Sequence, residues 1–199
     1  MTNLLKRPAA RKGAALACAC WLVAGCATQA GAQEGAFAPV LRHLADRLLT
    51  ADQVALSKWD SGQPVYDPAR EAQVIANVSA MAPAYGVQAA DAAEVFTDQI
   101  EANKTVQYAL LNDWRRAGSA PTAPRQSLPN TIRPQLDTLQ KAILQGLHEA
   151  GPARARADCA TQVALDAERV AREKSLDTLH RVALDRATAR LCWQRSARS

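Results

Sequence analysis

Apolar side chains recur at helical spacing through the long segments of this 199-residue chain after residue 36. The clearest run is Ile132, Leu136, Leu139, Ile143 and Leu147. An α-helix repeats every 3.6 residues, so this spacing places one apolar stripe along one helix face. Ala and Leu dominate the 48% apolar fraction, and no segment alternates apolar and polar residues as a half-buried strand does. The pattern predicts an all-α fold with a single domain large enough for a real core.

Clusters of helix-breaking residues divide this domain, expected to cover 33–199, into about six helices. The expected helices are 37–59, 68–81, 89–116, 129–150, 153–171 and 173–195. Asp67 should cap the second helix, because its carboxylate can accept a backbone N–H and Pro68 fits the first turn. The Pro- and Ser-rich stretch 117–127 is expected to be a linker between the first three helices, about 37–116, and the C-terminal helices, about 129–195.

The first 32 residues have the features of an export signal. A basic segment, Lys6–Lys12, precedes an apolar stretch that is too short to span a bilayer as a stable helix. Ala30-Gly31-Ala32 is a cleavage site that would release a soluble periplasmic or secreted protein beginning at Gln33. Val23-Ala24-Gly25-Cys26 instead resembles a lipoprotein signal, which would end the leader at residue 25 and anchor the protein through a lipid on Cys26. Both routes export the chain, and the sequence leaves both open.

The charge balance gives no support for nucleic-acid binding. The formal net charge is +5, but four of the 24 basic residues lie in the leader, which has no acidic residue. Without the leader, 20 basic residues face 19 acidic ones, a net charge of +1. Proteins that bind phosphate backbones need a basic surface. We therefore expect no nucleic-acid partner.

Because an exported protein enters an oxidising compartment, its cysteines can form disulfides. Three of the five lie in the leader, and the mature domain keeps Cys159 and Cys192. An even pair in an oxidising compartment predicts a disulfide, two free buried thiols being the alternative. No residues have metal-ligand spacing, and we expect His43, His148 and His180 to be partly exposed helical residues.

A set of polar residues stands at helical spacing in the first half of the chain. Its members are Arg47, Lys58, Asp67, Arg70, Glu71, Asn103 and Gln107. Arg47 and Lys58 are eleven residues apart, a rotation within about 20° of three full turns, so they share a helix face. Asn103 and Gln107 are an i, i+4 pair and share a face too. Cations and neutral amides on helices are typical of a site that binds a small dianion and catalyses its reaction by electrostatic stabilisation, without a nucleophile.

In order and spacing, this set resembles the all-helical (AroQ-class) chorismate mutases, and within them the exported gamma subclass. The resemblance covers about residues 37–114, and the segment 98–108, DQIEANKTVQY, is especially close to the family's third-helix signature. Arg133, in SLPNTIRPQLDTLQ, stands where the gamma subclass supplies an arginine from its fourth helix. The pair Cys159 and Cys192 also fits that subclass.

The resemblance implies an isomerase of aromatic amino acid biosynthesis that converts chorismate to prephenate. This intramolecular [3,3] rearrangement transfers no proton, and the resemblance implies no metal and no cofactor. Arg47, Arg70 and Arg133 would hold the two carboxylates of chorismate. Lys58 would reach a carboxylate and the ether oxygen, and Gln107 would donate a hydrogen bond to that oxygen.

The remaining members of the set would complete the substrate contacts. Glu71 and the backbone of Asp67 would meet the substrate hydroxyl, and Asn103 would support the carboxylate end. If Arg133 fills its expected place, each chain holds a complete site, whereas a partner chain completes the site in the family's shorter cytoplasmic members. The sequence leaves open a homodimer. The alternative function is a non-catalytic helical envelope lipoprotein or binding protein.

Overall fold

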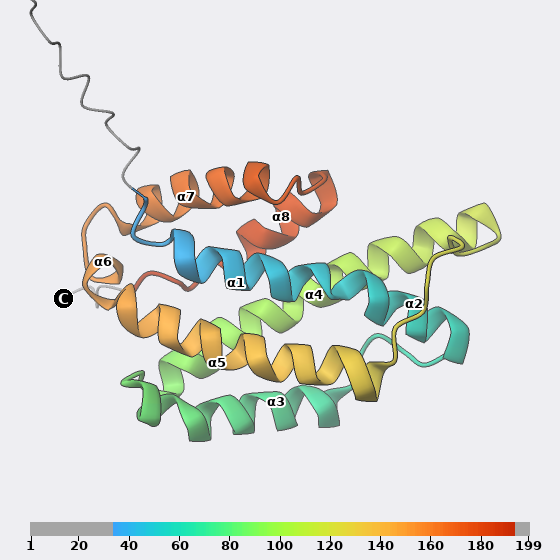
Figure 1. The fold of residues 1–199 in the computed structure, drawn as a ribbon, viewed down its shortest axis with the longest axis horizontal. Helices are drawn as coiled ribbons and strands as arrows, with labels where there is room; N and C mark the ends of the chain where they lie inside the picture. Colours follow the sequence, from blue (N-terminus) through green and yellow to red (C-terminus); the bar gives the residue numbers. More distant parts are fainter. Residues whose placement is uncertain (1–33, 194–199) are drawn as a thin grey trace, which may run out of the picture. The chain divides into compact units, whose positions relative to one another are not determined.

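The computed structural model describes residues 34–193, and the regular secondary structure of this part of the chain consists of helices, without a strand. Its elements are α1 (Ala38–Leu49), α2 (Ala51–Ser61), α3 (Pro68–Met81), η1 (Ala82–Tyr85), α4 (Ala89–Ala117), η2 (Leu128–Ile132), α5 (Arg133–Glu149), α6 (Gly151–Arg154), α7 (Cys159–Glu173) and α8 (Thr178–Ala187) (Figure 1). The all-α prediction is confirmed. The expected leader, with its two cleavage signals and Cys26, lies outside the described residues.

The expected helix 37–59 bends at Thr50, where α1 ends and α2 begins, and the apolar pattern does not reveal this bend. The Thr50 hydroxyl donates to the carbonyl oxygen of Arg47 at 2.7 Å. A threonine hydroxyl that bonds back to the preceding turn bends a helix without ending it. Thr50 keeps helical backbone angles, φ −68° and ψ −16°, so α2 follows α1 along nearly the same direction in Figure 1.

The second helix begins as the sequence predicts. Asp67 accepts a hydrogen bond from the backbone N–H of Arg70 at 3.0 Å, and Pro68 is the first helical residue. The C-terminal bounds differ more from the prediction. Ser127 caps the short π-helix η2 by accepting from the N–H of Asn130, and α5 begins only after this turn. Within the described residues, the tail holds three helices, α6, α7 and α8, where two were expected.

The long helix α4 is the centre of the packing. It lies against α8, α3 and α2, while α1 packs against α5 and α7 (Figure 1). These contacts bury one large apolar cluster, in which Phe37, Leu44 and Phe96 are fully buried. A smaller cluster forms near the end of α4, where Trp59 and Trp114 meet edge to face with ring centroids 6.0 Å apart. The two tryptophans therefore serve packing.

Buried ion pairs fasten the C-terminal tail to α4. Asp98 is 1% exposed and accepts from Arg190 at 2.8 and 2.9 Å, and Arg186 pairs with it as well. Although burial opposes the shift, hydrogen bonds from these two arginines hold the pKa of Asp98 below its usual value. In the first turn of α4, Asp91 accepts hydrogen bonds from both terminal nitrogens of the buried Arg154 at 2.6 and 2.7 Å. Two points of α4 are thus tied to the tail by charge.

The predicted disulfide joins Cys159, at the start of α7, to Cys192, after α8. It adds a covalent tie to the region that the ion pairs already hold.

None of the helices in residues 34–193 is long and apolar enough to cross a membrane. In the same range, no group of three His, Cys, Asp or Glu side chains is placed to hold a metal ion.

The prediction that His180 is partly exposed is wrong. Its side chain lies between α2 and α8 at 5% exposure. The two ring nitrogens contact the carboxylates of Asp52, at 3.1 Å, and Asp177, at 2.8 Å. The hydrogen bond with Asp52, aided by Asp177 and opposed by burial, raises the pKa of His180 to about 9. His180 is therefore a protonated link between the first and last parts of the domain, whereas His43 and His148 are half-buried and exposed, as predicted.

We expect reduction of the Cys159–Cys192 disulfide to lower stability without unfolding the domain. The sequence separation is 33 residues. Closing a loop of this length stabilises the fold by about 3–4 kcal/mol, and its loss should lower the melting temperature by about 10 °C. Circular dichroism with and without reductant measures both effects. The helical signal at 25 °C should persist, and a domain that unfolds at 25 °C when reduced would contradict a tail held by ion pairs.

The His180→Gln variant should lose stability in a pH-dependent way. The folded-state pKa of about 9 lies above the unfolded value of 6.5. Charged His180 therefore contributes its full stabilisation below pH 6.5, and the contribution is lost as the pH rises through 9. Urea denaturation of wild type and variant should show a larger difference at pH 6 than at pH 9.5. His148→Gln, at an exposed position, is the control; equal differences at both pH values for His180→Gln would refute the charged link.

Candidate active site

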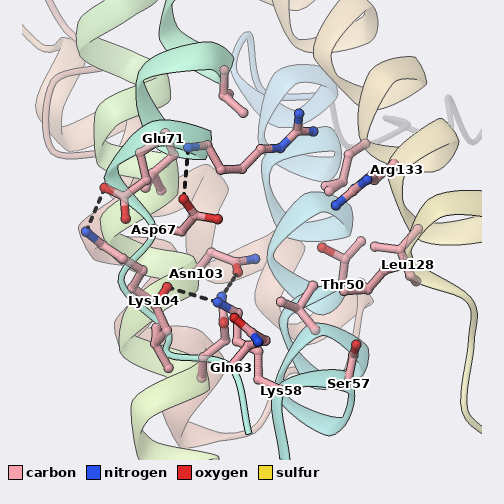
Figure 2. Close-up of a pocket in the computed structure, with 18 of the residues that line it drawn as sticks. Thr50, Ser57, Lys58, Gln63, Asp67, Glu71, Asn103, Lys104, Leu128 and Arg133 are labelled. Atoms are coloured by element: carbon pink, nitrogen blue, oxygen red, sulfur yellow. Dashed lines mark hydrogen bonds and ion pairs between the residues drawn. The ribbon is translucent and has the colours of Figure 1, made fainter. Parts of the chain in front are cut away.

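One pocket gathers the whole polar set that the sequence singled out. It has a volume of about 580 Å³ and lies between α1, α2, α3, α4 and the beginning of α5 (Figure 2). All eight predicted site residues line it, namely Arg47, Lys58, Asp67, Arg70, Glu71, Asn103, Gln107 and Arg133. Residues 86 positions apart in sequence therefore share one cavity.

Arg47 lies at the inner wall of the pocket. It projects from the last turn of α1, is only 7% exposed, and its guanidinium carbon lies 5.7 Å from the centre of the Phe96 ring. Burial, together with the nearby charge of Arg70, lowers the pKa of Arg47 to about 10, so it stays protonated at neutral pH. Its Nε is buried and has no hydrogen-bond partner in the part of the chain that the structure describes. A buried donor without a partner is costly, which favours an anionic ligand here.

Lys58 reaches the pocket from the last turn of α2. Gly62 ends this helix in the left-handed conformation, φ 69°, and its N–H bonds to the carbonyl of Lys58. The chain then turns back, and the Lys58 ammonium donates to the carbonyls of Pro64 and, at 3.0 Å, Val65. Burial lowers the pKa of Lys58, although two nearby carboxylates act in the opposite direction. The structure therefore holds this cation at the pocket by hydrogen bonds to two backbone carbonyls of the loop that follows α2.

Gln107 and Asn103 form a hydrogen-bonded chain along α4. The amide nitrogen of Gln107 donates to the side-chain oxygen of Asn103 at 2.6 Å, and Asn103 donates to the carbonyl oxygen of Arg47 at 3.4 Å. This network sets the orientation of the Gln107 amide. An amide nitrogen carries two N–H groups, so one remains for a ligand. Gln107 is 5% exposed, which keeps this donor away from bulk water.

The remaining predicted residues line the outer part of the pocket. Arg70, in the first turn of α3, donates to the side chain of Gln73 at 2.6 Å. Glu71, the next residue, has one carboxylate oxygen that is buried and unpartnered among residues 34–193. Arg133 is exposed and begins α5, directly after the η2 turn, and Figure 2 shows it across the pocket from Glu71.

Two charged residues of the pocket, Lys104 and Asp137, were not predicted. Lys104 lies three residues before Gln107 and Asp137 four residues after Arg133, so both share a helix face with a predicted residue. That spacing could have identified them. In all, five cationic and three anionic side chains line the pocket, a net charge of +2. A small dianion would neutralise it.

Comparison with known proteins relates most of this chain to one family. Residues 38–108 match the family described as chorismate mutase type II. The chain is 30% identical to the secreted chorismate mutase of Mycolicibacterium smegmatis over 154 residues, 77% of this chain and 84% of that protein. It is also 30% identical to the secreted chorismate mutase of Mycobacterium tuberculosis over 149 residues, 74% of each chain.

Solved structures show the same relationship. The crystal structure of chorismate mutase from Burkholderia phymatum has a TM-score of 0.80 and 62% identity, covering 82% of this chain and all of that one. The corresponding enzyme from Burkholderia thailandensis has a TM-score of 0.75 and 34% identity, covering 79% of this chain and 99% of that one.

Proposed function

This chain belongs to the chorismate mutase type II family, and on that premise we propose which of its side chains perform the rearrangement of chorismate to prephenate. The enzyme is an isomerase of aromatic amino acid biosynthesis. The observation that carries the assignment of roles is the pocket itself, which collects all eight predicted residues around a net charge of +2. Chorismate, with two carboxylates, is a dianion of complementary charge.

The arginines hold the substrate carboxylates. A guanidinium group presents parallel N–H donors that match both oxygens of a carboxylate. Arg47 supplies a buried, protonated donor group at the inner wall. Arg70 and Arg133 supply two more from α3 and α5. Fixing both carboxylates would hold the flexible substrate in the reactive diaxial form, which lowers the barrier by reducing the entropy lost in the transition state.

Lys58 and Gln107 stabilise the negative charge that develops on the breaking ether oxygen. Neither has to transfer a proton, so catalysis is electrostatic. The contacts of Lys58 with the carbonyls of Pro64 and Val65 are ones that substrate oxygens can replace. Gln107 is already oriented by Asn103 and keeps one amide N–H for the ether oxygen. Asn103 thus has two roles. Its hydrogen bond to the Arg47 carbonyl supports the carboxylate end of the substrate, and its side-chain oxygen orients the amide of Gln107.

Glu71 binds the substrate hydroxyl. Its buried carboxylate oxygen accepts no hydrogen bond from the described residues, and a hydroxyl donor would satisfy it. The backbone of Asp67 is proposed to assist, since the Asp67 side chain is already used to cap α3. With Arg133 supplied by the same chain, each copy holds a complete site, so the proposal requires no partner subunit.

The chain is an exported protein, as its two secreted relatives indicate. We propose that residues 1–32 act as the signal and that the enzyme domain, 33–199, is released in soluble form. Lipid attachment at Cys26 is the alternative, and it would leave the same domain tethered to a membrane. A non-catalytic envelope protein is disfavoured, because a binding scaffold has no reason to keep Lys58 and Gln107 in one pocket.

The purified exported protein should convert chorismate to prephenate, followed as the loss of chorismate absorbance, and EDTA should not change the rate. Lys58→Ala should lower kcat by about 10²–10³, the usual effect of removing one donor to a developing anion. Arg47→Ala should be similarly impaired. Both variants should keep the wild-type circular dichroism spectrum.

Lys141→Met is the matched control, because Lys141 is exposed on α5 and its removal changes the net charge equally. Inactivation by EDTA would refute the purely electrostatic mechanism. Near wild-type turnover of either alanine variant would refute the roles of Lys58 and Arg47.

The Gln107→Glu variant should acquire a pH dependence that the wild type lacks near neutrality. A glutamine donates through a neutral amide, whereas a glutamate donates only when protonated. The kcat of the variant should therefore rise as the pH falls, which steady-state assays from pH 5 to 8 would show. A variant with an unchanged pH profile would mean that residue 107 does not face the ether oxygen.

A further inference from the structure

Lys104 is a charged residue of the pocket for which the proposed mechanism has no role. Its ammonium group lies 3.0 Å from an oxygen of Glu71 on α3 and 2.8 Å from an oxygen of Glu101 one turn back on α4. It also lies 5.3 Å from the centre of the Tyr66 ring, within the range of a cation–π contact. Figure 2 shows the Lys104 side chain reaching across to Glu71.

These contacts commit Lys104 to partners within the protein. An ammonium group has three N–H donors and no acceptor. Two carboxylates lie within ion-pair distance of it, and the Tyr66 ring lies close by. Although burial opposes the shift, the hydrogen bonds to Glu101 and Glu71 raise the pKa of Lys104, so the ion pairs persist at neutral pH. The route by which these contacts can affect catalysis is through one of the partners of Lys104.

Glu71 is the partner that faces the pocket. Its two carboxylate oxygens have different environments: Oε2 is held by Lys104, whereas Oε1 is buried with no partner in the described residues. The torsion that turns a carboxylate is soft. A fixed contact at one oxygen therefore determines where the other oxygen lies.

We propose that Lys104 is a positioning residue, which fixes the carboxylate of Glu71 so that its free oxygen is presented to the hydroxyl of chorismate. The inference rests on the proposed role of Glu71 in binding that hydroxyl. The hydroxyl does not take part in the bond rearrangement, so its contact contributes similarly to the ground state and the transition state. Loss of such uniform binding raises KM and leaves kcat nearly unchanged.

The test is a Lys104→Met variant of the exported protein, which keeps the length of the side chain and removes the charge. We expect KM for chorismate to rise about 10-fold, the effect of losing one charge-assisted hydrogen bond, with kcat within about 2-fold of wild type. Lys141→Met should leave both parameters unchanged. An unchanged KM for Lys104→Met, or a fall in kcat at constant KM, would overturn the proposal.

A double-mutant cycle separates positioning from a structural role. In a Glu71→Ala background there is no carboxylate to orient, so adding Lys104→Met should raise KM no further. Equal effects of Lys104→Met in both backgrounds would show that Lys104 acts independently of Glu71, and the proposal would be wrong.

Chemical rescue covers the case in which Lys104→Met fails to fold. Lys104→Cys can be alkylated with 2-bromoethylamine, which restores an ammonium group at nearly the lysine length on the same folded protein. KM should be high before and near wild type after this treatment, and a KM that does not respond would overturn the proposal. Wild type assayed in parallel keeps the two questions apart, because an inactive wild type would refute the proposed function, whereas an active wild type with an unaffected Lys104→Met variant would refute only this inference.

Discussion

The buried charge of Asp98 is the constraint on which the rest of the structure depends. At 1% exposure it requires Arg186 and Arg190, because leaving a buried carboxylate unpaired costs about 3–5 kcal/mol. These partners place α8 against α4. Five residues further along α4, Asn103 begins the polar segment that continues to Gln107. One half of α4 therefore packs against the tail, and the other half lines the pocket. The positions of the Asn103 and Gln107 amides thus depend on the contacts between α4 and the tail.

The helices that local signals define were predictable, and those set by distant contacts were not. Asp67 followed by Pro68 fixes the start of α3 through neighbouring residues, so its bounds agree with the sequence expectation. The break at Thr50 depends on which way one hydroxyl turns, and apolar spacing carries no information about it. The burial of His180 was not predicted because one of its two carboxylate partners, Asp52, lies 128 residues earlier in the chain. Burial by a distant segment leaves no trace in the periodicity around a residue.

Eight polar residues of the pocket were predictable, whereas Lys104, Asp137 and the hydrogen bonds among the lining residues were not. The spacing of Arg47 and Lys58, and that of Asn103 and Gln107, identifies shared helix faces, and family resemblance supplies the order. Which atoms stay free depends on loops and side-chain rotation. The contact of Lys58 with Pro64 arises from the turn at Gly62, and the two environments of the Glu71 oxygens arise from a lysine 33 residues away. The sequence therefore identifies which polar residues line the pocket, but the structure is needed to show which of them are hydrogen-bonded to each other.

The net charge of +2 in the pocket does not distinguish the substrate from the product. Rearrangement makes and breaks bonds within one molecule and leaves both carboxylates intact, so prephenate carries the same charge as chorismate. Electrostatic complementarity therefore cannot expel it. Product release must depend on shape, because the new carbon–carbon bond moves the two carboxylates relative to each other. If Arg133 and Arg47 each hold one carboxylate, as proposed, the exposed Arg133 at the start of α5 would lose its carboxylate to water sooner than the buried Arg47. The difference in burial between these two arginines would then set the side of the pocket from which the product leaves.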